Sequence, residues 1–337
     1  MTRVIFALTL LVLLASTVHA QHLRIFACAI ANDSTGAFLG GSSNGSGLYQ
    51  SDDTGKTWKH LGWDNIKCYS MDEVNSSKGR ILYEATGLGI LRSTDYGAHW
   101  KQLTDWRISE AMDVAVNQKN PNEIYVATAH GPWRTEDGGK TWNYLAGVDP
   151  PYCSRVIYAP DSSGFAGFVL GAESGLYWRS ETDTGWQSSV GGPVDVRDIK
   201  VRIGKLRTDE RTHKNYRIVW WFAASAEDGI YISRDGLNGF SGRRHKYREP
   251  RGSNPIWCVC QDEDGDITGG PNEVAYTQYG SDYANSTIDR QDTDVACCLM
   301  IGNTNILGRL GEGVEIAHHF YLPDRQIWTL KSFLITP

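Results

Sequence analysis

The sequence lacks a marked excess of charge of either sign, because its 337 residues contain 33 Lys and Arg against 39 Asp and Glu. Proteins that hold nucleic acid carry a clear basic surplus, so we expect no nucleic-acid partner. After residue 20 the chain also lacks an apolar run long enough to cross a bilayer. The composition therefore predicts no membrane span in the chain beyond its first residues.

Recognised disulfide and metal patterns are missing as well. The seven cysteines are an odd number, so they cannot all pair within one molecule. Cys258-x-Cys260 and the adjacent Cys297-Cys298 lack the CxxC spacing and nearby histidines of a structural zinc site. We expect buried free thiols, no bound metal and no cofactor. The thiols concerned are Cys28, Cys68, Cys153, Cys258, Cys260, Cys297 and Cys298.

The N-terminus has the features of a secretory signal peptide. Arg3 precedes an apolar run from Val4 to Leu14, and a small-x-small triplet ends at Ala20. The run is short for a membrane span, and a retained N-terminal anchor is the alternative. We predict cleavage after Ala20 and a soluble, monomeric domain over residues 21–337, either periplasmic or extracellular.

Glycine and large aromatic residues are abundant, with 36 Gly, 12 Trp and 16 Tyr. This mixture is typical of short strands joined by tight turns. An eight-residue motif occurs three times, as SDDTGKTW at 51–58, STDYGAHW at 93–100 and TEDGGKTW at 135–142. Degenerate copies stand at 180–186 and 233–240. Repeated motifs at regular spacing indicate a fold built from repeated units.

The repeat period predicts the architecture. A glycine and a short apolar strand precede each motif, and these glycines are spaced 42, 42, 44 and 54 residues apart. Four strands per unit at this period are typical of a β-propeller. We predict an all-β fold, a single seven-bladed β-propeller of four-stranded antiparallel blades, with a protruding loop at 204–215. The expected first strands of the units are 24–31, 67–74, 110–117, 155–160, 197–202, 256–261 and 295–301. The segment at 327–330 resembles the Trp-x-x-Leu pattern that follows the three full motifs, so we expect it to close the last unit.

The eight-residue motif resembles the Asp-box (BNR) repeat, S/T-x-D-x-G-x-T-W/F. This repeat is found in sialidases, xyloglucanase-type glycosidases, sortilin-like receptors and photosystem II assembly factors. The resemblance covers the chain after residue 20, and it implies that the boxes are structural and lie on the face away from the ligand. The residues given this structural role are Asp53, Asp95, Asp137, Asp183, Asp235, Trp58, Trp100 and Trp142.

In such propellers, ligands are expected on the opposite face, where the first strands begin and the loops between second and third strands turn. Arginines and a Trp there suit an anionic or hydroxyl-rich ligand. The ligand-binding candidates are Arg24, Arg107, Glu110, His130, Arg155, Arg197 and Trp257. The candidate catalytic carboxylates are Glu173, Glu227 and Asp228.

The sequence departs from both glycosidase patterns. Leu23-Arg24-Ile25-Phe26 keeps the Arg and Ile of the sialidase substrate motif but not its aromatic residue or Pro, and 40–44 contains no acid. The segment 124–142 is similar to xyloglucanase-type enzymes, yet its loop at 128–131 lacks their Asp. These losses favour a secreted module that binds a glycan or an extracytoplasmic protein. A glycoside hydrolase, xyloglucanase-type or sialidase-like, that uses other carboxylates on this face is the alternative.

Overall fold

A computed structural model describes most of residues 22–335. The predicted signal peptide at 1–20 therefore lies outside the described residues. The other residues left out are 21, 32–44, 64, 78, 160–162, 190, 210, 212, 228, 235, 241–245, 248–254, 262–264, 272, 279–286, 291–294, 302–303, 310–312, 317–318, 322–324 and 336–337.

Nearly all regular structure in the described residues is antiparallel β-sheet, and the 3-10 helix η2 (Leu237–Phe240) is short. The first sheet has the order β3 (Lys59–Leu61), β2 (Gly47–Ser51), β1 (His22–Ala31) and β30 (Arg325–Ile335). The second contains β4 (Cys68–Ser76), β5 (Gly79–Thr86), β6 (Gly89–Ser93) and β7 (Lys101–Gln102). The third contains β8 (Ala111–Val116), β9 (Ile124–Thr128), β10 (Gly131–Thr135) and β11 (Asn143–Tyr144).

Four more sheets follow along the chain, each with four described strands. The fourth contains β12 (Cys153–Ala159), β13 (Gly167–Ala172), β14 (Gly175–Ser180) and β15 (Gln187–Ser188). The fifth has the order β16 (Val196–Ile203), β19 (Val219–Ser225), β20 (Gly229–Ser233) and β21 (Lys246–Tyr247). The sixth contains β22 (Cys258–Gln261), β23 (Gly265–Gly270), β24 (Glu273–Gln278) and β25 (Thr287–Arg290), and the seventh contains β26 (Val295–Ile301), β27 (Thr304–Arg309), β28 (Gly313–Ile316) and β29 (His319–Tyr321).

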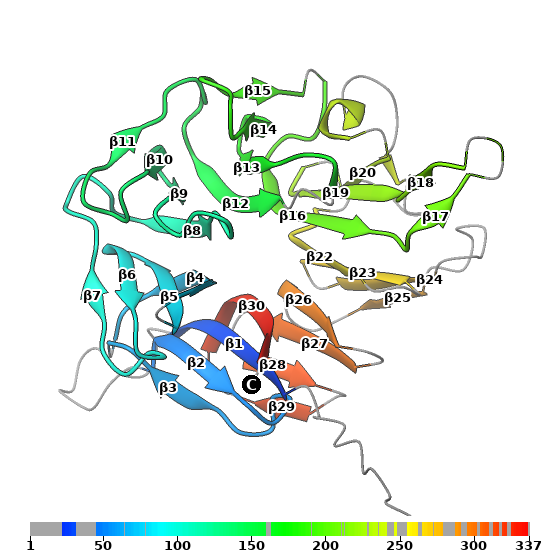
Figure 1. Cartoon of the computed structure of the whole chain (residues 1–337). Coiled ribbons are helices and arrows are strands. Elements are labelled where there is room, and N and C mark those ends of the chain that lie inside the picture. Colours follow the sequence, from blue (N-terminus) through cyan, green and yellow to red (C-terminus); the bar gives the residue numbers. More distant parts are fainter. Residues whose placement is uncertain are drawn as a thin grey trace, which may run out of the picture.

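The sheets surround a common centre (Figure 1), and one edge strand of each sheet faces it. Contacts between these inner strands run from β4 through β8, β12, β16, β22 and β26 to β30, and β30 contacts β4 in turn. The first sheet joins the two ends of the chain, because β30 pairs with β1 along its whole length. Pairing of the terminal strands covers two sheet edges that would otherwise be open to other chains.

This pairing corrects two sequence-based assignments. The expected first strand at 24–31 is the second strand of its sheet, and the inner position is taken by β30. The segment at 327–330, expected to close the last unit, belongs to β30 in the first sheet. Because neighbouring strands of a sheet run in opposite directions, the start of β1 lies at the opposite edge from the starts of β4, β8, β12 and β16.

Carboxylates connect neighbouring inner strands. Asp113 of β8 accepts the N–H of Val114 (2.9 Å) through one oxygen and the N–H of Val156 in β12 (2.9 Å) through the other. A buried carboxylate that receives two backbone hydrogen bonds links two sheets without an unsatisfied polar group. The same arrangement joins Asp72 to Glu73 and Val116, and Asp198 to Ile199 and Val259.

Three copies of the repeated motif form the same turn. Asp53 accepts hydrogen bonds from the Thr57 N–H (2.8 Å), the Thr57 hydroxyl (2.7 Å) and the Ser51 hydroxyl (2.8 Å). These donors, the Thr57 N–H foremost, lower the pKa of Asp53 to about 2. The glycine of this turn, Gly55, has a φ of 89°, a conformation that side chains rarely adopt. Asp95 and Asp137 make the equivalent bonds in the other two turns.

The remaining motif residues follow the sequence pattern to different degrees. The indole N–H groups of Trp58 and Trp100 donate to the glycine carbonyl of their own turns at 2.8 and 3.0 Å. Trp142 is buried between the second and third sheets. Asp183, in the shortened copy, accepts the Ser180 N–H at 3.1 Å. Asp235 lies outside the described residues.

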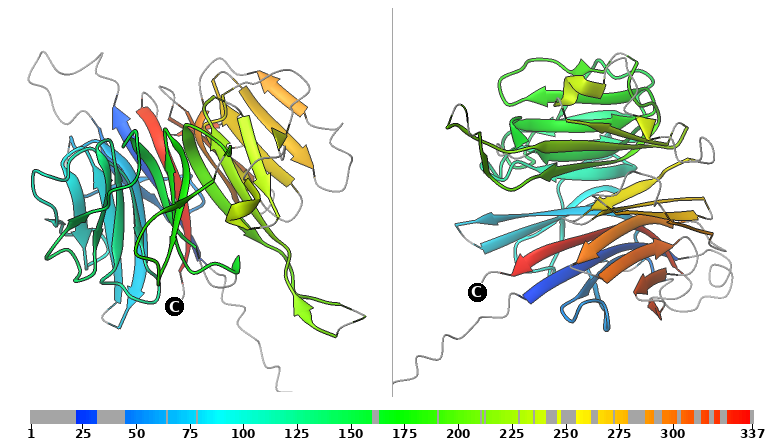
Figure 2. Two further views of the ribbon diagram at one scale, coloured as in Figure 1. Left: turned by 90° about the horizontal axis from the view of Figure 1, so that it is seen from above. Right: turned by 90° about the vertical axis from the view of Figure 1, so that its right-hand side faces the viewer.

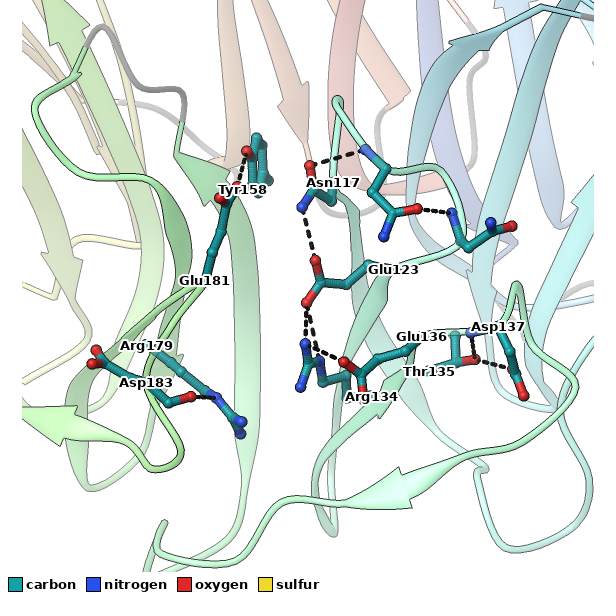
Figure 3. A network of polar contacts seen from close by, with 12 residues as sticks. Asn117, Glu123, Arg134, Thr135, Glu136, Asp137, Tyr158, Arg179, Glu181 and Asp183 are labelled. Atoms are coloured by element: carbon teal, nitrogen blue, oxygen red, sulfur yellow. Dashed lines mark hydrogen bonds and ion pairs between the residues drawn. The ribbon is translucent and has the colours of Figure 1, made fainter.

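The end of the sheets at which these turns lie, called the box edge below, carries further polar links. Figure 3 shows Arg134 beside Glu123, with Nε to Oε1 at 3.0 Å, and beside Glu136, with Nη2 to Oε1 at 2.7 Å. On the neighbouring fourth sheet the Tyr158 hydroxyl donates to Glu181 at 2.7 Å, as Figure 3 also shows. The charged side chains named here are thus paired with other side chains of the protein, as those of the box turns are.

All seven cysteines are buried thiols that lie outside disulfides. Six lie in the inner strands β4, β12, β22 and β26, where small side chains fit between crowded backbones. Cys28 lies in β1, which is a second strand, so its expected place in a first strand is wrong. The insertion predicted at 204–215 forms the hairpin β17 (Arg207–Thr208) and β18 (Asn215–Tyr216), which extends beyond the sheets (Figure 2).

Candidate functional site

The edge opposite the box turns, called the upper edge, is where β4, β8, β12 and β16 begin. Backbone hydrogen bonds join the loops of neighbouring sheets along it. Glu110 N–H donates to Gly87 O at 3.0 Å, which links the third sheet to the second. Asp195 N–H donates to Glu173 O at 2.8 Å, which links the fifth sheet to the fourth. The upper edge is thus a fixed platform for the side chains that extend from it.

Bulges in the inner strands set the direction of these side chains. The pairing register shifts near the start of β4, β8, β12 and β16. A bulge places an extra residue on one strand and redirects its side chain. The residues at the shifts are Tyr69, Met112, Ser154 and Arg197.

Two residues of the upper edge have unusual backbone conformations. Glu110 has a φ of 46° and Asp195 a φ of 43°, and each directly precedes an inner strand. A non-glycine residue in this region costs about 1–3 kcal/mol and persists only where its surroundings enforce it. Such strain is concentrated at functional sites. Both residues also take part in the side-chain pairs of this edge.

Four consecutive sheets bring ionisable and aromatic groups together here. Glu110 Oε2 lies 3.5 Å from His130 Nε2. Arg197 forms an ion pair with Asp195, with Nε to Oδ1 at 2.7 Å. The Arg197 guanidinium also lies over the ring of Tyr152, 5.5 Å from its centroid.

Two pKa shifts show how close these groups are. Burial raises the pKa of Tyr69, and the charges of Glu110 and Tyr152 raise it further. Burial lowers the pKa of Arg197, but the hydrogen bond and charge of Asp195 raise it by more, so it lies above its ordinary value. Tyr69 lies at the bulge of β4 as Arg197 lies at the bulge of β16, and we group it with these residues on this ground. We call Tyr69, Glu110, His130, Tyr152, Asp195 and Arg197 the edge cluster.

Large apolar side chains are exposed next to this cluster. Trp106, in the connection from β7 to β8, is 87% exposed. Leu88, in the loop between β5 and β6, is 56% exposed. The strand that follows this loop is held to the connection, since the Ile90 N–H of β6 donates to the Thr104 hydroxyl at 2.9 Å. Exposed aromatic and aliphatic side chains beside charged pairs are typical of a recognition surface.

A second group of charges is buried beneath the upper edge. Arg155 of β12 lies between Asp198, with Nε to Oδ1 at 3.1 Å, and Asp113, with Nε to Oδ2 at 3.5 Å. Its side chain is only 11% exposed. Burial lowers the pKa of Arg155, and the charges of Asp198 and Asp113 raise it by more, so that it lies above its ordinary value. Arg155 thus has charged partners within the fold, and we leave it out of the edge cluster.

The structure separates the other residues predicted from the sequence. The expected place of Arg24 on the ligand face is wrong, because β1 is a second strand, and Arg24 pairs with Asp52 beside the first box turn at 2.7 Å. Arg107 lies at the upper edge and pairs with Asp105 at 2.7 Å. Trp257 is half-buried, and its backbone N–H donates to Gly269 O at 2.8 Å.

The candidate catalytic carboxylates lie on two neighbouring loops. Glu173 and Glu227 are exposed at the turns between the second and third strands of the fourth and fifth sheets. Asp228 lies outside the described residues. Within the described part of the chain no group of three or more His, Cys, Asp or Glu is arranged to hold a metal ion. No described helix is long and apolar enough to cross a membrane.

Sequence reasoning missed Tyr69, Trp106, Leu88 and Asp195. Tyr69 follows the start of β4 as Arg197 follows the start of β16, so comparing the two strands would have found it. Trp106 and Leu88 lie in connections, where the sequence pattern does not distinguish an exposed aromatic residue from a packed one.

Comparison with solved structures gives matches that agree in architecture. YCF48 bound to D1 peptide matches with a TM-score of 0.52 and 13% identity, over 80% of this chain and 86% of that one. YCF48 from Cyanidioschyzon merolae matches with a TM-score of 0.55 and 16% identity, over 80% and 87%. These matched proteins, like the further one described below, are β-propellers. The chain has a β-propeller fold.

A further match is the extracellular domain of the putative one component system BT4673 from B. thetaiotaomicron, with a TM-score of 0.57 and 14% identity. This match spans 88% of the present chain but only 38% of the BT4673 domain. Neither a protein-family model nor a curated protein matches the sequence. At these identities the likeness concerns the fold alone.

Proposed function

We propose that this protein is a secreted, seven-bladed β-propeller, formed by residues 21–337 after removal of a signal peptide. Seven four-stranded sheets in the described residues, with contacts that run from β30 back to β4, support the blade count. The box turns then correspond to Asp-boxes on the face away from the ligand. The protein acts as a monomeric binding module at its upper edge.

The ligand that we propose is a segment of an extracytoplasmic protein. The observation that carries this proposal is the edge cluster, in which four consecutive sheets combine opposite charges with aromatic rings. Trp106 and Leu88 add exposed apolar surface beside it. Trp, Tyr and Arg dominate the binding energy of protein interfaces, and ion pairs of both signs suit a peptide backbone with mixed side chains. YCF48, which matches over most of its length, has been solved with a bound peptide.

A glycan is the second candidate ligand. An indole ring as exposed as that of Trp106 offers a flat apolar face for a sugar ring. The alternative activity, glycoside hydrolysis, would need a pair of carboxylates, one on each side of the scissile bond. Two carboxylates below the edge, Asp113 and Asp198, already hold Arg155 and backbone N–H groups. Only Glu173 and Glu227 are left among the described candidates.

Screening the purified protein on peptide and glycan arrays tests this proposal. We expect specific binders, whose affinity falls at least tenfold in Trp106→Ala and in Arg197→Gln. Arg92→Gln, on the third strand of the second sheet, is the matched control for loss of a guanidinium. Binders that are unaffected by Trp106→Ala and Arg197→Gln would show that the ligand lies elsewhere, and turnover of a glycan that is lost in Glu227→Gln would favour the hydrolase.

A further inference from the structure

A basic cleft lies at the base of the β17–β18 hairpin, where the end of β16 and the start of β19 meet it. The cavity has a volume of about 230 Å³. Among the described residues, Arg202, Lys205 and Arg207 line it together with Ile203, Gly204, Ile218 and Trp220. We call this cavity the hairpin cleft. It lies at the opposite end of β16 from the edge cluster.

The charge of the chain is strongly uneven around this cleft. Residues 200–220, the segment that contains β17 and β18, have 7 Lys and Arg against 2 Asp and Glu, a net charge of +5. The rest of the chain contains 26 Lys and Arg against 37 Asp and Glu, a net charge of −11. Since charges in solution are screened over about 8 Å at physiological salt, a small anion near the cleft experiences mainly the basic segment.

Aromatic stacking orders the cationic groups. The Arg202 guanidinium lies 4.8 Å from the ring centroid of Trp220, and the Arg234 guanidinium lies 5.7 Å from it. A guanidinium stacked on an indole keeps its N–H groups in its own plane, where they can meet two oxygens of one anion.

The base of the hairpin is fixed as well. The Gly204 N–H donates to Ile218 O at 2.8 Å, and Arg217 Nη1 donates to Gly204 O at 3.2 Å. These bonds hold the two segments that line the cavity at one separation. An arrangement formed before binding loses little conformational entropy when the ligand enters.

We propose that the hairpin cleft binds the sulfate or phosphate group of an anionic saccharide. Its volume suits one tetrahedral oxyanion with the adjoining part of a sugar rather than a polymer backbone. A long polyanion such as nucleic acid would also pass over the acidic remainder of the surface and be repelled there. Arginine recognises such oxyanions through paired hydrogen bonds, and Lys205 adds a point charge at the rim.

Calorimetric titration of the full protein tests this proposal. The probes are N-acetylglucosamine 6-sulfate and N-acetylglucosamine 6-phosphate, with unsubstituted N-acetylglucosamine and a short single-stranded DNA as comparisons. We expect binding of at least one charged sugar and none of the uncharged one. The relative affinity for the two charged sugars distinguishes a sulfated from a phosphorylated ligand.

The variants are Arg202→Gln and Lys205→Gln, each expected to weaken binding about tenfold, the effect of one charged hydrogen bond. Lys205 is exposed, so its replacement tests the cleft even where loss of the stacked Arg202 disturbs the fold. Lys101→Gln, on the exposed strand β7, removes the same charge elsewhere and is expected to bind as the wild type does.

Absence of binding to both charged sugars would overturn the proposal. Equal weakening in Lys101→Gln, or tighter binding of the DNA, would overturn it too, because either result would indicate a general electrostatic surface. Trp106→Ala is expected to leave this binding unchanged, so a failure of the hairpin cleft is distinguishable from a failure of the edge cluster.

Discussion

Replacing Glu84 by Gln should remove much of the loss of stability that this protein undergoes as the pH rises. Glu84 lies in β5 and is completely buried between the first and second sheets. Among the described residues neither of its carboxyl oxygens meets a nitrogen or oxygen donor. Burial raises the pKa of Glu84 to about 8 from an ordinary value of 4.5, although the Cys68 thiol acts in the opposite direction.

The direction of this change in stability follows from which state, folded or unfolded, holds the Glu84 proton. Between pH 4.5 and 8 the folded protein keeps the Glu84 proton, while the unfolded chain releases it. The unfolded state therefore gains free energy of ionisation, and stability falls as the pH rises through this window. A shift from 4.5 to about 8 corresponds to a loss of roughly 3–4 kcal/mol between pH 5 and pH 8. Glutamine has nearly the same shape and cannot ionise, so the variant lacks this loss.

Urea unfolding at pH 5, 6, 7 and 8, followed by tryptophan fluorescence, measures the effect. The comparison uses the change of unfolding free energy with pH, which cancels any constant cost of burying the glutamine amide of the variant. Glu227→Gln is the matched control, because Glu227 is exposed, and it should keep the wild-type slope. Equal slopes for the wild type and Glu84→Gln would show that Glu84 does not keep its proton in the folded protein over this pH range.

Three other perturbations have defined outcomes. Arg155→Met leaves Asp113 and Asp198 buried without their cation and should lower the free energy of unfolding by about 3–5 kcal/mol. Asp113→Asn should then lower this free energy by less in the Arg155→Met variant than in the wild type. Equal effects of Asp113→Asn in the two backgrounds of this double-mutant cycle would contradict the pairing. Asp95→Ala removes the acceptor of one box turn and should lower the melting temperature while ligand binding stays unchanged, so unchanged melting would contradict a structural role. Burial raises the pKa of Cys153 to about 12, so this thiol and the other buried ones should react with a thiol reagent only after unfolding, and rapid labelling of the native protein would contradict their burial.

Local patterns predicted the repeated parts of the fold. The box turns could be found from the sequence because their bonds join residues at most four positions apart, as between Asp53 and Thr57. The starts of β4, β8, β12 and β16 were also close to the predicted ones, since their β-branched runs are bounded by turn residues. The assignment of 24–31 failed for a different reason. Its partner, β30, lies at the other end of the chain, and the repeat period does not say which terminus supplies the inner strand.

The site was predictable only in outline. Glu110, His130 and Arg197 were expected at the upper edge, because residues at strand starts and in the adjoining loops must lie there. Their partners were not predictable, since Arg197 meets Asp195 and Tyr152 through a β-bulge and a positive φ that no short motif encodes. Arg202 of β16 and Arg234, which follows β20, likewise meet Trp220 of β19 only after the fifth sheet has folded.

One experiment on the purified wild-type protein and its Trp106→Ala variant tests most directly whether the upper edge binds a ligand. Each is screened for binding to peptide and glycan arrays and, in parallel, for hydrolysis of sialosides, xyloglucan and other β-glucans. We expect a ligand that the wild type binds and Trp106→Ala loses, with equal melting temperatures and no hydrolysis by either protein. Hydrolysis by the wild type, or ligand binding that survives in Trp106→Ala, would contradict this expectation.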